Sequence, residues 1–283
     1  MKIIECPRDA MQGIHDWIPT EVKAKYINQL LKVGYDTIDF GSFVSPKAIP
    51  QLKDTAEVLA KLDLKEDSAN LLAIVANVRG AEDACHFEEI DYLGFPFSIS
   101  EQFQQRNTNS SIEESLVRVE QIKKLTEAHR KKLVIYISMG FGNPYGEAWS
   151  PEIAAHWSQR LAADVGIEII ALSDTIGVSN PENIQQLFST LIPALPQVEF
   201  GGHLHSTPET RIEKIDAAYH AGCRRLDAAI AGYGGCPMAN DDLVGNMATE
   251  TVLSYFQKTG IDTGLNFKEF ETARAMATTV FPI

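Results

Sequence analysis

The sequence predicts an α/β protein in which eight parallel strands, each followed by a helix, close into a (β/α)8 or TIM barrel. Three observations predict this fold: β-rich runs alternate with amphipathic stretches, eight such runs occur, and no Gly/Ser-rich linker separates them. The chain of 283 residues is then expected to form one domain, 1–283, with extra C-terminal helices. A doubly wound sheet is the alternative, but it normally carries a glycine-rich phosphate turn after its first strand, and Pro7–Gly13 has no such pattern.

Each element follows from a local pattern. Strands are expected where β-branched and aromatic residues gather between turn residues; the candidates are Lys2–Arg8, Thr37–Phe43, Leu71–Ala76, Ile90–Phe97, Leu133–Met139, Ile167–Leu172, Val198–His203 and Arg225–Ile230. Helices are expected at Thr20–Val33, Arg79–Phe87, Ser111–His129, from Pro151, from Pro181, at Arg211–His220, and over 241–259 and 267–279. The expected N-caps are Thr20 and the residues before three prolines, Ser150, Asn180 and Thr207.

The charge balance narrows the classes of partner. Lys and Arg number 25 and Asp and Glu 38, which gives a formal net charge of −13. A charge of this sign repels phosphate backbones and anionic surfaces, so we expect no nucleic-acid and no membrane partner. No apolar run approaches the roughly 20 residues of a membrane-spanning helix, and the N-terminus is predicted as a strand rather than a signal peptide. The four cysteines form no CxxC pair, so the expected location is the cytoplasm.

A metal site is predicted where the strands of the barrel end, since the chemistry of such barrels lies there. His203 and His205 stand two apart at a strand end and therefore point to the same face. Asp9 follows the first strand and Asn246 the eighth, and these strands are neighbours in a closed barrel. This set of N and O donors suits a divalent ion such as Mg²⁺ or Mn²⁺. Zn²⁺ is an alternative, although no thiolate falls obviously within the set; the other interpretation is a hydrogen-bonded polar pair.

Further polar residues at strand ends are candidates for catalysis. Arg8 can hold negative charge that develops on a carbonyl oxygen, which is the main requirement of enolate chemistry. Asp174 either orients that arginine, acts as a base or caps the following turn, and Asp39 has the same ambiguity.

A glycine-rich loop, Gly232–Pro237, presents Cys236 after the last strand. A cysteine on such a loop can donate or accept a proton close to a bound ligand. By contrast, Cys6, Cys85 and Cys223 are expected in the core, where most cysteines lie.

Seven motifs, in one order along the chain, together resemble a known family. They are Pro7-Arg8-Asp9, Ser42–Lys47, Asn109–Ser115, Asp174–Val178, His203-Leu204-His205, Gly234–Pro237 and Gly245–Glu250. The chain resembles the hydroxymethylglutaryl-CoA lyase family, which comprises metal-dependent TIM-barrel lyases related to isopropylmalate and citramalate synthases. The resemblance runs from the first strand nearly to the C-terminus and is more specific than any single motif.

The resemblance implies a site and a reaction. The implied metal ligands are Asp9, His203, His205 and Asn246, and the implied catalytic residues are Arg8, Asp39, Asp174, Cys236 and Glu250. Arg8 would stabilise an enolate, Cys236 would protonate its carbon, His203 or Asp9 would take the substrate hydroxyl proton, and the other carboxylates would lie around Arg8 and the metal. Gln12, Ser42, Arg106 and Asn107 would bind the acyl-CoA. The reaction would cleave 3-hydroxy-3-methylglutaryl-CoA to acetoacetate and acetyl-CoA, a step of leucine degradation, in a homo-oligomer (dimer or tetramer).

Some positions depart from the usual pattern of this family, so alternatives stay open. Asp39 stands where Glu is usual, Ser206 follows the second histidine where Asp is usual, and Ala10–Ile14 replaces Gly-Leu-Gln-Asn-Glu. One alternative is a related synthase that forms the carbon–carbon bond, although such enzymes usually carry a C-terminal regulatory domain and this sequence ends soon after the barrel. The other is a catalytically silent barrel that binds a CoA ester or a protein, which predicts lost ligands, whereas the metal set and Cys236 are present.

Overall fold

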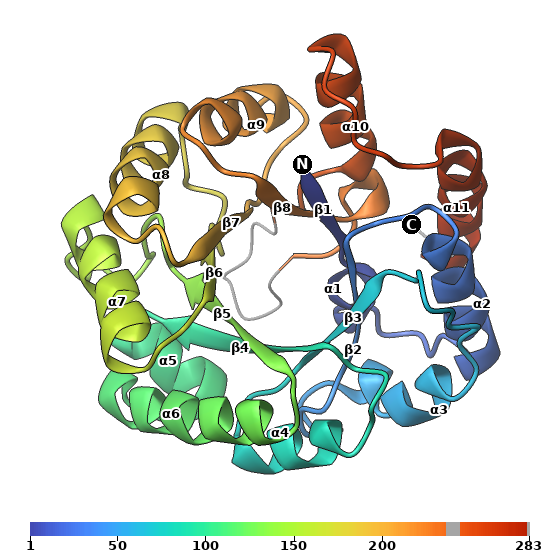
Figure 1. Ribbon diagram of the computed structural model, residues 1–283, viewed down its shortest axis with the longest axis horizontal. Coiled ribbons are helices and arrows are strands. Elements are labelled where there is room, and N and C mark those ends of the chain that lie inside the picture. The colour runs from blue at the N-terminus through green and yellow to red at the C-terminus, as the bar shows by residue number, and fades with distance from the viewer. Residues whose placement is uncertain (236–243, 282–283) are drawn as a thin grey trace.

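The computed structural model, which describes residues 1–235 and 244–281, contains the predicted barrel (Figure 1). Eight strands pair in parallel in sequence order, and β8 pairs with β1 to close the ring. The strands are β1 Lys2–Glu5, β2 Thr37–Ser42, β3 Asn70–Ile74, β4 Tyr92–Ser98, β5 Lys132–Ser138, β6 Ile169–Ser173, β7 Glu199–His203 and β8 Arg225–Ala228. The predicted (β/α)8 fold class is therefore confirmed.

Helices cover the outside of the strand ring (Figure 1). The helices are α1 Pro7–Gln12, which follows directly on β1 and is not part of this outer layer, and α2 Thr20–Leu31, α3 Thr55–Leu59, α4 Val78–Cys85, α5 Glu101–Thr108, α6 Ile112–Ala128, α7 Pro151–Asp164, α8 Pro181–Ala194, α9 Arg211–His220, α10 Thr249–Lys258 and α11 Phe267–Val280. Two short 3₁₀ helices lie at Pro50–Leu52 and Ile230–Gly232. Helix α11 packs against α2, so the last helix of the chain completes the outer layer beside one of the first.

The first strand is shorter than predicted. It ends at Glu5 instead of Arg8 because Pro7 begins the short helix α1, and proline is favoured at a first helical position. Arg8 and Asp9 therefore project from this helix just beyond the strand, and both are buried. The site residues are thus held by a turn of helix at the carboxyl end of β1.

The helix caps are partly as predicted. Ser150 and Asn180 accept hydrogen bonds from the backbone at the starts of α7 and α8, which confirms both. Thr20 does not cap α2, because it is already helical and its hydroxyl donates to Asp54 at 2.8 Å. Thr207 does not cap α9, because its backbone N–H bonds to Thr210 in a turn that precedes the helix.

Two apolar layers stabilise the barrel. The larger lies between strands and helices and includes Phe95, Ile135 and Leu172. A smaller cluster consists of Leu72, Val134, Tyr136, Ile169 and Ala171. Its members alternate along their strands with residues of the larger layer, so they fill the barrel interior.

The inward face of β8 is charged. Arg225 is 2% exposed, and its side chain passes β7 at Gly201, where a Cβ would lie only 3.0 Å from its Cγ and Cδ. Asp227, two residues further along the same face, is also buried. The barrel interior therefore holds polar groups directly below the strand ends.

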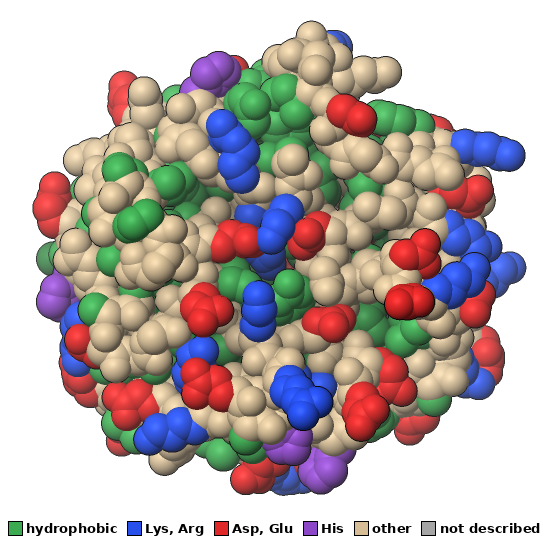
Figure 2. Space-filling view, in the orientation of Figure 1, with side chains coloured by type: hydrophobic (Ala, Val, Ile, Leu, Met, Phe, Trp, Pro, Cys, Tyr) green, Lys and Arg blue, Asp and Glu red, His purple; other side chains and the backbone are tan. Residues whose placement is uncertain are grey.

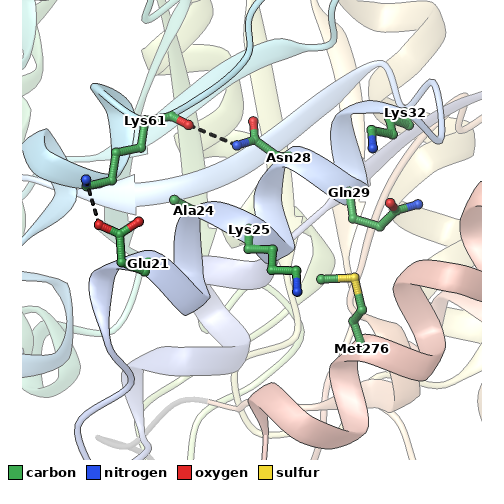
Figure 3. A pocket seen from close by; sticks show the side chains of 8 residues that line it. All are labelled: Glu21, Ala24, Lys25, Asn28, Gln29, Lys32, Lys61 and Met276. Atoms are coloured by element: carbon green, nitrogen blue, oxygen red, sulfur yellow. Dashed lines mark hydrogen bonds and ion pairs between the residues drawn. The ribbon is translucent and has the colours of Figure 1, made fainter.

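The described surface shows no single-sign patch on the face of Figure 2, where acidic and basic side chains intermix and gather at the centre of the ring. Helices α2 and α11 border a surface cavity of about 310 Å³ (Figure 3). Its lining includes Lys25, Lys32 and Lys61, and none of its lining residues is a predicted site residue.

Among the described residues, no helix has both the length and the apolar character required to cross a membrane.

Glu5 is a buried carboxyl group between the end of β1 and α10. It is 1% exposed and accepts hydrogen bonds from the Ile230 backbone N–H at 2.9 Å and the Thr249 hydroxyl at 2.7 Å. Burial raises the pKa of the Glu5 carboxyl from 4.5 to about 8, against the lowering effect of both hydrogen bonds. The carboxyl therefore stays largely protonated near neutral pH.

We expect Glu5 to make the free energy of unfolding fall as the pH rises from about 5 to 8. The folded chain holds the Glu5 proton up to a pKa of about 8, whereas the unfolded chain releases it near 4.5, so rising pH favours unfolding across this window. Glu5→Gln is neutral at every pH and should lose this component. Urea unfolding at pH 5 and pH 8 measures it, and equal pH dependence in the two proteins would contradict the protonated carboxyl.

Candidate metal centre and active site

The strand ends bring the four predicted metal ligands together. Asp9, His203 and His205 each offer one ligand atom, and these atoms lie within 4.8 Å of one another. Asn246 joins them, since its amide Nδ2 donates to Asp9 Oδ2 at 2.6 Å. Asp9 and His205 are buried, the latter with 3% exposed, and His203 is half-buried.

A pair of β-bridges explains how residues so distant in sequence meet. His205 pairs with Asn246 in an isolated antiparallel bridge, and Ala248 pairs with Ala229 just after β8. The helix predicted over 241–259 therefore begins only at Thr249, as α10, because Asn246 and Ala248 pair in these bridges instead. Residues 241–243 of that prediction lie outside the described part. The segment before α10 is therefore extended and carries Asn246 to the site.

Arg8 is held by three side chains. Its Nε and Nη2 donate to Asp39 Oδ2 at 3.0 and 2.6 Å, and its Nη1 donates to Asp9 at 2.8 Å and Gln12 at 2.9 Å. Gln12 also donates to Asp9 Oδ1 at 2.7 Å. A guanidinium has five N–H groups, and these contacts occupy four of them. Among the described residues, one N–H of Nη2 has no acceptor and remains for a ligand.

The charges in this cluster depend on one another. Burial raises the pKa of Asp39 from 3.8 to about 6, although the Arg8 guanidinium opposes this shift. At Asp9 burial also favours the neutral form, but Arg8 and the two histidines outweigh it and hold the pKa of that carboxyl below its usual value. Asp9 is therefore ionised at neutral pH and can ligate a cation.

The two histidines differ in their surroundings. His203 Nδ1 lies 3.2 Å from Asp227 Oδ2, and although burial acts the other way, this carboxylate raises the pKa of His203. Burial, and then the neighbouring His203, lower the pKa of His205 from 6.5 to about 4. His205 is therefore neutral at pH 7, with a lone pair free for a metal ion.

Asp227 is a site residue that the sequence reasoning missed. It stands in β8, a strand whose four residues are all buried, where ionisable residues are rare unless paired. An aspartate in a predicted buried strand was therefore the sequence signal that could have indicated this residue. A carboxylate on one imidazole nitrogen fixes the ring and leaves the other nitrogen for a metal, an arrangement common among metal-binding histidines.

Cys6 lies closer to the site than predicted. It is buried, as are Cys85 and Cys223, which confirms the expectation for all three. Its sulfur, however, forms a second group with His203 and Asp227, in which the ligand atoms also lie within 4.8 Å of one another. A thiol therefore does lie beside one of the proposed metal ligands, His203.

The donor set fits a divalent cation. It provides an ionised carboxylate, a neutral imidazole, a second imidazole oriented by Asp227, and an amide, all converging at the strand ends. Oxygen and imidazole donors of this kind suit Mg²⁺, Mn²⁺ or Zn²⁺. The candidate metal site is therefore supported by the contacts as well as by the spacing of the ligands.

Two of the predicted carboxylates have other partners. Asp174 accepts from Lys214 Nζ at 3.0 Å and from the Ser179 backbone N–H at 3.1 Å, so it caps the turn after β6. Glu250 accepts from the Ala231 backbone N–H at 3.0 Å. Within the described residues, no hydrogen bond joins either carboxylate to Arg8, which Asp39, Asp9 and Gln12 orient instead.

The residues expected to bind the acyl-CoA are spread around the strand ends. Gln12 belongs to the Arg8 cluster. Ser42 ends β2, and its hydroxyl donates to the Ile74 carbonyl at 3.2 Å. Arg106 and Asn107 lie on α5, where the exposed Arg106 stacks over Tyr145 at 5.6 Å from the ring centroid. Cys236, the expected acid, lies outside the described residues.

The fold and these contacts define a (β/α)8-barrel protein with a candidate metal site of carboxylate, imidazole and amide donors at its strand ends. The HMGL-like family model matches residues 2–277, and the chain belongs to this family. The chain is 34% identical to the mitochondrial hydroxymethylglutaryl-CoA lyase of Bos taurus over 278 residues, which cover 97% of this chain and 84% of that protein. It is 32% identical to the cytoplasmic 3-hydroxy-3-methylglutaryl-CoA lyase of Rattus norvegicus, with 94% and 77% covered.

A solved structure shows the same fold with a ligand. The HMG-CoA lyase from Acinetobacter baumannii, in complex with coenzyme A and 3-methylmalate, matches with a TM-score of 0.91 and 28% identity. The match covers 99% of this chain and 91% of that one. The likeness therefore extends over the whole barrel, including the strand ends where the candidate site lies.

Proposed function

We propose that the protein is a carbon–carbon lyase that cleaves 3-hydroxy-3-methylglutaryl-CoA to acetoacetate and acetyl-CoA. One observation carries this proposal: Asp9 accepts a hydrogen bond from Arg8 and also lies beside His203 and His205. A guanidinium with one N–H unused among the described residues therefore lies next to the candidate metal site. The relatives named above support the substrate, and the coenzyme A complex supports an acyl-CoA ligand.

We further propose that Asp9, His203, His205 and Asn246 hold Mg²⁺ or Mn²⁺. Bound there, such an ion supplies Lewis-acid polarisation of the substrate oxygens. Asp227 orients His203, and Asn246 orients the Asp9 carboxylate, so the protein presents these donors without rearrangement.

The other site residues have separate roles in this proposal. In this proposal the substrate hydroxyl loses its proton to His203 or Asp9. The carbon–carbon bond then breaks to give the ketone of acetoacetate, and its electron pair passes to the thioester enolate. Arg8, oriented by Asp39 and Gln12, donates to the enolate oxygen, and Cys236 gives a proton to the carbon. Asp174 and Glu250 support the neighbouring loops, and Ser42, Arg106 and Asn107 bind the acyl-CoA.

A substrate panel tests the reaction. Purified protein with Mg²⁺ or Mn²⁺ should release acetoacetate and acetyl-CoA from 3-hydroxy-3-methylglutaryl-CoA, and chelation should abolish the release. The same protein should not condense acetyl-CoA with pyruvate or 2-oxoisovalerate, which are the condensations expected of the related synthases. Condensation without cleavage would replace the lyase by a synthase, and neither reaction would favour a silent barrel.

His205→Ala is expected to weaken divalent metal binding by at least about 10-fold, because it removes one of four proposed ligands. Calorimetric titration with Mn²⁺ measures the affinity. His220→Ala is a matched control, since His220 is an exposed histidine at the end of α9. Equal Mn²⁺ affinity in His205→Ala and wild type would remove His205 from the ligand set.

Arg106→Ala is expected to raise the Michaelis constant for the acyl-CoA with little change in turnover. Arg106 is exposed on α5 and has no contact with the proposed metal ligands among the described hydrogen bonds, so a contact that it makes with the anionic acyl-CoA should be equal in the ground and transition states. Steady-state kinetics at low and high salt test this. Identical kinetics for the variant and wild type at both salt concentrations would show that this arginine does not bind substrate.

We also propose a cytoplasmic homo-oligomer, a dimer or a tetramer, with no nucleic-acid or membrane partner. The net charge of −13 supports the absence of the last two. The relatives above are named for both mitochondrial and cytoplasmic forms. Sedimentation of the purified protein measures the number of chains.

A further inference from the structure

Lys214 is a buried lysine on α9 whose ammonium group reaches the strand ends. It is 1% exposed, and its Nζ donates to Asp174 Oδ2 at 3.0 Å, to the His205 carbonyl at 2.8 Å and to the Gly177 carbonyl at 3.3 Å. A lysine ammonium has three N–H groups, so all three are used. The side chain is therefore fixed in one arrangement.

The three acceptors belong to two neighbouring segments of the site. Asp174 and Gly177 follow β6, whereas His205 follows β7 and is a proposed metal ligand. The Asp174 backbone N–H also donates to the His203 carbonyl at 2.9 Å. Lys214 thus joins the turn after β6 to the backbone of the histidine pair at the point where the pair leaves the sheet.

Burying the Lys214 ammonium group and the Asp174 carboxylate costs free energy. A buried ion pair loses the hydration of both groups, and well-packed apolar residues of similar size often stabilise a fold equally well. What an apolar pair cannot do is bind a carbonyl and a carboxylate at fixed positions. Asp174 Oδ1 is also buried and has no hydrogen-bond partner in the described part of the chain, so Lys214 and Ser179 orient this carboxylate through Oδ2 alone.

We propose that Lys214 is a positioning residue for the metal site: it fixes the His205 peptide and the Asp174 carboxylate relative to each other. This inference rests on the proposed metal site, and not on the identity of the substrate. Without the ammonium group, the His205 carbonyl and Asp174 lose their common donor, so the His205 backbone loses one of the contacts that set its position. Loss of a residue that orients a metal ligand typically weakens metal binding by about 10- to 100-fold.

Lys214→Met tests the proposal, with Lys23→Met as the matched control. Lys23 is also a buried lysine, 2% exposed, that donates to an aspartate (Asp54, 2.7 Å) and to a backbone carbonyl, but its partners belong to the segment between β2 and α3. Both variants should lower the melting temperature. Only Lys214→Met should also weaken Mn²⁺ binding, by about 10-fold or more in calorimetry, and broaden the electron paramagnetic resonance spectrum of bound Mn²⁺.

The comparison of the two variants decides the outcome. Wild-type Mn²⁺ affinity in Lys214→Met would overturn the proposal, as would an equal loss of affinity in Lys23→Met, which would show general destabilisation. If wild type itself binds no Mn²⁺, the proposed metal site fails instead, so the two failures are distinguishable. Should Lys214→Met not fold, Lys214→Gln provides the same comparison, because its shorter amide cannot reach all three acceptors.

Discussion

Arg8→Gln is expected to lower turnover by about 10²- to 10³-fold while the Michaelis constant changes far less, because one preorganised donor to a developing oxyanion contributes a rate factor of this size. The structure shows why the guanidinium is preorganised. Asp39, Asp9 and Gln12 occupy four of its N–H groups, so the remaining one has a fixed direction before substrate arrives. Glutamine can supply one amide donor, but neither the positive charge nor the paired contact with Asp39.

Two further variants separate this role from simple ion pairing. Arg8→Lys keeps a charge near Asp39 and Asp9 but loses the forked contact, so turnover should still fall strongly. Arg79→Gln is the same substitution at an exposed position, with 89% of the side chain exposed, and should behave as wild type. Steady-state kinetics and thermal unfolding of all three proteins are the measurements. If turnover survives in Arg8→Gln and only substrate binding weakens, Arg8 is a binding residue.

The barrel could be predicted because its strands are buried on both faces. Runs of β-branched and aromatic residues mark such strands directly, and the observed strands fall within three residues of the predicted ends. The error at β1 has a local cause, since Pro7 permits either a strand end or a helix start and the local sequence does not decide between them. The extended segment at Asn246 and Ala248 depends on pairing with distant residues, which no local pattern reveals.

The closeness of the proposed ligands could be predicted because a strand places residues two apart on one face and a barrel gathers the strand ends. The residues that orient them were harder to find. Asp227 lies within β8, and its contact with His203 depends on the pairing of β8 with β7 in the closed barrel. Lys214 occupies a helix position where lysine ordinarily faces solvent, and only the packing of α9 against the strand ends makes it buried. Orientation of ligands arises from tertiary contacts, so the sequence alone did not reveal it.

The chain that leads to Cys236 passes directly against the metal ligands. A Cβ at Gly234 would lie 2.8 Å from the Asp9 carbonyl oxygen and 2.7 Å from Asn246 Nδ2, so only glycine permits this approach. Gly234 and Gly235 also have positive φ angles of 97° and 137°. Cys236 itself lies outside the described residues.

Cys236→Ser is expected to lower cleavage by about 10²- to 10⁴-fold, the usual contribution of a positioned proton donor, while metal and substrate still bind. A serine hydroxyl has nearly the same shape but gives up a proton far less readily than a thiol. Cys85→Ser is the control, because it makes the same exchange in α4. Calorimetry for binding and a coupled assay for acetoacetate separate the two effects.

Alkylation tests the position of Cys236 independently of turnover. Burial raises the pKa of Cys6 and Cys85, and raises that of Cys223 to about 12, so these three thiols should react slowly with iodoacetamide. Cys236 should be the thiol that labels first, and a bound acyl-CoA should protect it, because Cys236 is proposed to give a proton to the reacting carbon. Near-normal turnover in Cys236→Ser, or labelling of Cys236 that is indifferent to the acyl-CoA, would assign the acid role to another group. Protection together with normal turnover would leave Cys236 beside the substrate but outside the proton transfer.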